Sequence, residues 1–113
     1  MTDVVAEVLD LWDAGGAPDR AAVKAAVKQT LAELVARAPG RSVEVRVPPY
    51  AAVQAVPGST HRRGTPPAVV ECDPRTWLGL ATGRLAWADA VADGRVRASG
   101  ERSDLSAYLP LPG

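Results

Sequence analysis

The side chains best suited to chemistry are one histidine, one cysteine and a pair of arginines. His61 could act as a general base or a metal ligand, because an imidazole titrates near neutral pH. A metal site needs several converging ligands, and no second histidine or cysteine pair accompanies His61. No nucleophile signature surrounds Ser42, Ser59 or Cys72 either. The favoured interpretation of His61 is therefore an exposed loop residue.

Cys72 stands directly before Asp73-Pro74, a helix start where the helix dipole could lower the pKa of a thiol. A lone cysteine at a strand end is more often a small buried hydrophobic residue, and it can form no intramolecular disulfide.

The segment HRRGTPP (61–67) carries two arginines that would suit an anionic head group. It lacks the glycine spacing and the lysine of a phosphate loop, so a solvated loop is the simpler interpretation.

The composition indicates one globular domain without a dominant charge. The chain has 113 residues, 47% of them hydrophobic, and contains no phenylalanine. Its 13 basic and 13 acidic residues imply no attraction to nucleic acid or to an anionic membrane. No stretch approaches the ~20 apolar residues of a membrane span, and the acidic N-terminus argues against a signal peptide. We expect a soluble, cytoplasmic protein with no nucleic-acid partner and no stable membrane insertion.

Hydrophobic periodicity and turn residues divide the chain into short elements. Helical spacing predicts helices over 3–13 and 19–38, and alternation predicts strands over 43–47, 50–56 and 68–72. Two further helices (73–83 and 86–93) end at Gly83 and Gly94, a fourth strand covers 95–99, and Ser103 caps a final short turn. This order indicates an α+β fold: a mainly antiparallel sheet of four or five strands, covered on one face by helices. Residues 1–16 are expected to form an N-terminal helical appendage to a single domain over 17–113.

The stretch from Asp73 to Glu101 has a spacing of leucines, alanines and glycines that resembles the C-terminal half of the sterol carrier protein-2 family. The matching positions are Leu78, Leu80, Gly83, Leu85, Ala90, Gly94, Val96, Ala98, Gly100 and Glu101. The segments upstream are similar to a shorter, actinobacterial branch of that family. The resemblance implies a five-stranded sheet with an apolar tunnel between sheet and helices, and non-covalent binding of lipids.

The leading functional hypothesis is non-enzymatic binding or transfer of an apolar ligand (a sterol, a fatty-acyl chain or another lipid-like molecule) in a cavity between sheet and helices. No catalytic residue, metal or cofactor is expected. The residues expected to line the cavity are Val45, Val53, Val70, Trp77, Leu80, Leu85, Val91, Leu105 and Leu109. Pockets for such ligands are mostly apolar.

Two other hypotheses stay open. Tryptophan is also a large core filler, so the protein could be an interaction or accessory module with a filled core and no ligand. Such a module would dock, or form a homodimer, through helix 3–13 or an edge strand. Trp12 could then be either a core residue or a partner contact. An enzyme that uses His61 or Cys72 is disfavoured by the scarcity of catalytic groups.

Overall fold

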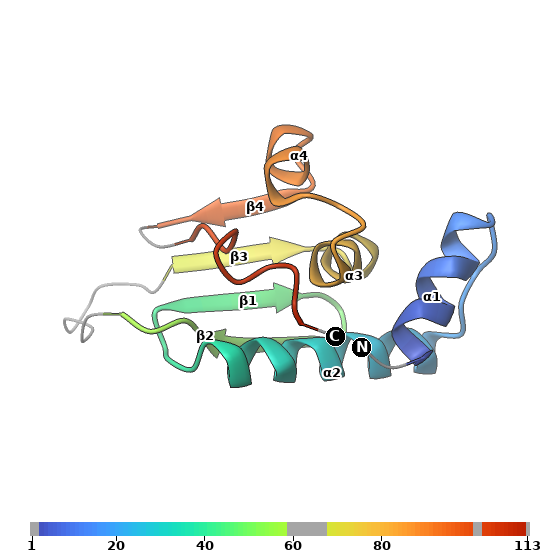
Figure 1. Ribbon diagram of the computed structural model, residues 1–113, viewed down its shortest axis with the longest axis horizontal. Coiled ribbons are helices and arrows are strands. Elements are labelled where there is room, and N and C mark those ends of the chain that lie inside the picture. Colours follow the sequence, from blue (N-terminus) through green and yellow to red (C-terminus); the bar gives the residue numbers. More distant parts are fainter. Residues whose placement is uncertain (1–2, 59–67, 101–102, 113) are drawn as a thin grey trace.

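The computed structural model describes residues 3–58, 68–100 and 103–112 of the chain. Within these ranges the chain forms one sheet of strand order β2-β1-β3-β4, with helices packed around it (Figure 1). The strands are β1 (Val43–Val47), β2 (Ala51–Ala55), β3 (Ala68–Cys72) and β4 (Val96–Ser99). The helices are α1 (Asp3–Asp13), α2 (Arg20–Arg37), α3 (Pro74–Thr82) and α4 (Trp87–Ala92). This set of elements confirms the predicted α+β class.

The sheet is mixed, so the prediction of a mainly antiparallel sheet is wrong. β1 pairs antiparallel with β2, and β3 pairs antiparallel with β4, but the central pair β1–β3 is parallel, with Val45 beside Val70. The end of β2 and the start of β3 both lie beside Val43, on opposite sides of β1. Because β2 ends and β3 begins at the same end of β1, β3 runs in the same direction as β1. Four strands are present in the described residues, at the lower end of the predicted four to five.

The two faces of the sheet differ as the alternating sequence predicts. Val43, Val45 and Val47 of β1 are fully buried, whereas Arg46 between them is exposed. On the open face Glu71 of β3 is the register partner of Arg46, so this face presents charges to solvent. On the buried face, α2, α3 and the C-terminal segment contribute the opposing half of one hydrophobic core, including Leu31, Leu34, Leu78, Leu80 and Leu105.

α1 lies at one end of the molecule and packs against α2 and α3 (Figure 1). Its side chains Val5, Val8 and Leu9 are buried. The helix ends with Gly15 in the left-handed conformation (φ 82°), and the Gly16 N–H donates to the carbonyl of Leu11 over 2.7 Å. This arrangement is a Schellman motif, which turns the chain sharply toward α2. In the described residues no helix combines the length and the apolar character that spanning a membrane requires.

The final turn is capped differently from the prediction. Asp104, not Ser103, supplies the capping oxygen, since its Oδ1 accepts from the Ser106 N–H over 2.8 Å. This backbone hydrogen bond is the main reason that the pKa of Asp104 lies below its ordinary value. Beyond the turn, the Leu111 N–H donates to the carbonyl of Ala81 over 2.9 Å, which ties the C-terminal segment to α3.

Candidate functional site

The nine side chains predicted to line a cavity lie at different depths. Fully or almost fully buried in the common core are Val45, Val70, Trp77, Leu80 and Leu105. Val53, Leu85 and Leu109 are half-buried, and Val91 on α4 is 43% exposed. Their role as ligand contacts stays a prediction, and the depth of the first five means that they already contact other protein side chains.

Trp77 is held in place by a hydrogen bond as well as by packing. The indole Nε1–H donates to Thr30 Oγ1 over 2.8 Å, and this hydroxyl in turn donates to the carbonyl of Ala26 over 2.8 Å. Trp77 is 0% exposed, so the bond satisfies the one polar atom of a large buried side chain. At this position the sequence permitted either a cavity wall or a core filler, and the contacts are those of a core filler.

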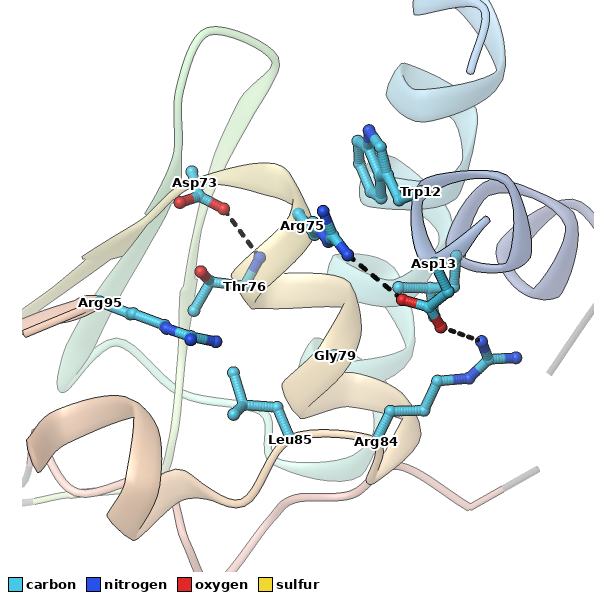
Figure 2. Close-up of a pocket in the computed structure, with 10 residues that line it drawn as sticks. Trp12, Asp13, Asp73, Arg75, Thr76, Gly79, Arg84, Leu85 and Arg95 are labelled. Atoms are coloured by element: carbon cyan, nitrogen blue, oxygen red, sulfur yellow. Dashed lines mark hydrogen bonds and ion pairs between the residues drawn. The ribbon is translucent and has the colours of Figure 1, made fainter. Parts of the chain in front are cut away.

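A cleft of about 680 Å³ opens to solvent between α1, α3 and the start of β4 (Figure 2). This volume falls within the ~300–1,000 Å³ that is typical of small-molecule sites. The residues that line it are Leu9, Trp12, Asp13, Asp73, Arg75, Thr76, Gly79, Arg84, Leu85 and Arg95. The cleft therefore combines an apolar part with several guanidinium groups.

The apolar part of the cleft comes from α1 and from the segment that follows α3. Leu9 and Trp12 stand three residues apart on α1 and share one helix face. Leu85 follows the end of α3, and its N–H donates back to the carbonyl of Gly79 over 3.1 Å. A Cβ atom on residue 79 would lie 3.1 Å from Leu85 Cβ, so glycine is what allows Leu85 to approach α3 this closely.

Ion pairs cross the cleft between α1 and the elements facing it. Asp13 accepts from Arg75 Nη2 through Oδ1 (3.3 Å) and from Arg84 Nη1 through Oδ2 (3.2 Å), as Figure 2 shows. Arg84 also reaches Asp10 over 2.9 Å. The hydrogen bond to Asp10 is the first cause of the raised pKa of Arg84. All four side chains are at least 40% exposed, so each pair contributes little to stability.

The other side of the cleft is formed by Asp73, Thr76 and Arg95. Asp73 caps α3, because its Oδ1 accepts from the Thr76 N–H over 2.7 Å. α4 ends at Gly94 (φ 73°), and the Arg95 N–H donates to the carbonyl of Ala90 over 2.9 Å. This helix end directs the Arg95 side chain into the cleft from the side opposite α1 (Figure 2).

Of the groups that first suggested chemistry, Cys72 is described by the structure and does not line the cleft. Cys72 is 5% exposed, and burial, followed by the charges of Asp73 and Glu71, raises the pKa of its thiol to about 12. The thiol is therefore protonated at neutral pH, as a packing role requires. His61 and the whole HRRGTPP segment (61–67) lie outside the described residues. No group of three His, Cys, Asp or Glu side chains able to hold a metal occurs in the described ranges.

Most residues of the cleft were not predicted as site residues. The sequence predicts Leu85 as a site residue and allows Trp12 to be either a core residue or a partner contact. It gives no site signal for the arginines, the aspartates, Leu9 or Thr76. The spacing of Leu9 and Trp12 on α1 is the one local signal. It shows a helix face but not which element that face meets.

The mixed sheet, its covered face and the open cleft together describe a small α+β domain with a cleft at its surface. A family model described as bacterial SCP ortholog matches residues 19–111, and the chain belongs to this family. The match confirms the resemblance to sterol carrier protein-2 drawn from the glycine and leucine spacing. No curated protein matches the chain. α1 precedes the matched residues, so the wall of the cleft that carries Leu9, Trp12 and Asp13 lies outside the family match.

Proposed function

We propose that the protein binds and transfers a lipid-like ligand without changing it chemically, in the cytoplasm, with the apolar part of the ligand in the cleft. The observation that carries this proposal is the open cleft, whose lining includes the apolar side chains of Leu9, Trp12 and Leu85. Membership of the SCP family supports lipid binding or transfer as the general function. Each ligand CH₂ group that leaves water would contribute about 0.8 kcal/mol.

The cleft is favoured over a cavity between sheet and helices because it needs no rearrangement. A ligand beside Trp77 would have to displace side chains that are fully buried and, for Trp77, hydrogen-bonded. Displacement of packed core side chains forfeits many van der Waals contacts at once. A ligand in the cleft replaces water instead.

Three tryptophans at different depths allow one experiment to distinguish these locations. Decanoate is titrated into ¹⁵N-labelled protein, and the indole N–H signals of Trp12, Trp77 and Trp87 are followed by NMR. We expect saturable shifts of the Trp12 signal, with the Trp77 signal unchanged. Shifts confined to Trp77 would place the ligand between sheet and helices. Absence of any saturable shift would overturn the proposal that the protein is a lipid carrier.

A pair of leucine variants tests the cleft directly. Leu85→Ala removes part of the apolar wall and should weaken decanoate binding by at least about threefold. Leu11→Ala is the matched control, because Leu11 is also a leucine on the protein surface, on α1, but is 47% exposed and does not line the cleft. Equal affinities for both variants would contradict the assignment of the site.

The second candidate is the interaction module with a filled core. It is favoured by the complete burial of the core around Trp77 and by Leu11, which α1 leaves exposed on its outer surface. In this hypothesis α1 or an edge strand docks onto another protein or a second copy, and no lipid binds.

A further inference from the structure

β2 forms one edge of the sheet, and nothing in its sequence protects that edge. In the strand order β2-β1-β3-β4 it pairs with β1 alone among the described residues. Every second residue of an edge strand directs its N–H and C=O groups away from the sheet, where another chain can pair with them. Natural edge strands are commonly blocked by a charged side chain, a proline or a bulge. β2 (AAVQA) contains no charged residue and no proline, and its register with β1 runs without a bulge.

A row of three cations on α2 follows the same edge. α2 lies along β2, and both elements run in the same direction (Figure 1). Arg20, Lys24 and Lys28 stand four residues apart, so they share one side of the helix. This side faces the turn between β1 and β2, because Arg20 and Lys24 line an open pocket of about 300 Å³ together with Pro49 and Tyr50. The row therefore begins where β2 begins.

The three cations have no ion-pair partner among the described residues. The one acidic residue of α2, Glu33, stands nine residues after Lys24 and so points to the opposite side of the helix, where its Oε1 accepts from Gln29 Nε2 over 3.3 Å. Asp19, next to Arg20 in the chain, is exposed and does not line the pocket. This edge therefore carries more positive than negative charge, although the charges of the whole chain balance.

The spacing of the cations matches the spacing of alternate residues in a strand. Four residues of an α-helix advance about 6 Å along its axis, and two residues of a strand advance about 7 Å. In a strand added beside β2, every second side chain would point to the face of the sheet on which α2 lies. Acidic side chains at these positions would each meet one cation of the row, and the side chains between them would lie on the open face.

We infer that β2 binds an extended segment of another protein in which acidic residues alternate with uncharged ones. The segment adds one strand to the sheet through backbone hydrogen bonds, and its acidic side chains pair with Arg20, Lys24 and Lys28. A second copy of this chain is a poor occupant. Antiparallel pairing of two β2 strands would put both α2 helices on the same side of the joined sheet, where their cations would repel one another.

The inference goes beyond the proposed lipid binding and does not rest on it. The cleft is lined by residues of α1, α3 and the segments next to α3 and α4, and it shares no residue with the pocket beside Tyr50. Loss of either activity by mutation should therefore leave the other unchanged.

The first test uses the peptide TETETET, blocked at both ends, which alternates glutamate with threonine, a residue that favours strands. It is titrated into ¹⁵N-labelled protein, and the backbone amide signals of Ala51–Ala55 are followed by NMR. We expect saturable shifts of these signals with TETETET and none with TKTKTKT, whose lysines would face the cations of α2. Absence of saturable shifts in β2 with TETETET would overturn the inference.

Charge variants of α2 test the side-chain pairing. Lys24→Gln should weaken TETETET binding about threefold, as expected for one exposed ion pair, and the double variant with Lys28→Gln about tenfold. Arg37→Gln is the matched control: it removes the same charge from the same helix, but Arg37 stands nine residues after Lys28 and points to the opposite side. An equal loss for Arg37→Gln would show that only the net charge of the protein matters, which contradicts the inference.

N-methylated peptides separate strand addition from charge attraction alone. Methyl groups on the threonine nitrogens block the N–H groups along one edge of the peptide, and methyl groups on the glutamate nitrogens block the other edge. One modified peptide should bind at least about tenfold more weakly than TETETET, and the other should bind about equally well. Equal affinities of the two modified peptides would show that no strand pairs with β2.

Vesicles of phosphatidylglycerol distinguish an acidic peptide from an anionic membrane surface, which would also attract a basic helix face. We expect no difference in vesicle binding between wild type and the double variant of Lys24 and Lys28. Vesicle binding that the double variant loses, together with no shift of β2 by TETETET, would assign the row of cations to a membrane surface and overturn the inference.

Discussion

The hydrogen bond between Trp77 and Thr30 gives a prediction about a single hydroxyl group. Thr30→Val leaves the buried indole N–H without an acceptor, which should cost about 1–3 kcal/mol in the free energy of unfolding measured with urea. Thr82→Val is the control. The Thr82 hydroxyl also donates to a carbonyl one turn earlier, that of Leu78 at 2.8 Å, but no side chain in the described residues depends on it. Equal losses for the two variants would contradict the structural role of Thr30.

The Cys72 thiol gives a second prediction at the scale of single residues, on how the stability of the protein changes at alkaline pH. The pKa of its thiol is raised from 9.0 to about 12, first by burial and then by Asp73 and Glu71. Between these two values the unfolded chain has lost the proton and the folded chain still holds it. The contribution to stability is therefore fully present below about pH 9 and is lost as the pH rises toward 12.

Denaturation of wild type and Cys72→Ala at a series of pH values between about 8 and 11 measures this effect. Other groups titrate in the same range, so the difference between the two proteins is the relevant quantity. Wild type should lose more stability than the variant over this range. Parallel curves would show that the thiol is not shielded in the folded state.

At the scale of elements, α1 is held by apolar burial more than by its ion pairs. Leu9→Ala removes a side chain that is 3% exposed and should lower the free energy of unfolding by about 2–5 kcal/mol. Asp13→Asn breaks two ion pairs between exposed groups and should lower it by less than about 1 kcal/mol. Urea denaturation compares both. A larger loss for Asp13→Asn would show that the charges position this wall of the cleft.

Elements with local signals could be predicted from the sequence, and their pairing could not. The bounds of α3 are clear from the sequence to within a few residues, because Asp73 caps its start, Pro74 follows and Gly83 ends it. Buried and exposed residues would alternate along β1 and β3 whether the two strands ran parallel or antiparallel. Their parallel pairing follows only from the position of the start of β3, which lies beside the start of β1. Local pattern decides which face is buried, and long-range topology decides direction.

The cleft is beyond prediction from the sequence for the same reason. Leu9 and Arg95 stand near opposite ends of the chain, and they face one cleft only because α1 packs on α3 and Gly94 redirects the chain into β4.

At the scale of the whole molecule, the protein has the dimensions of one folded unit. Its Cα radius of gyration is 13.8 Å, close to the ~13 Å expected for a domain of this length. The longest of its three extents is 45 Å, along the direction in which α1 lies at one end (Figure 1). α1 thus adds to the length of the molecule and supplies the cleft with a wall.

Whether a second copy binds this molecule separates the carrier hypothesis from the interaction module. The large apolar side chains exposed in the described residues are Leu11 on α1 and Val91 on α4, two helices that lie apart (Figure 1). A stable dimer buries roughly 1,200 Å² or more, for which two separate side chains are too little apolar surface. We therefore expect a monomer in sedimentation equilibrium, for wild type and Leu11→Asp alike. A wild-type dimer that Leu11→Asp converts to a monomer would favour the interaction module, because α1 would then be its docking surface.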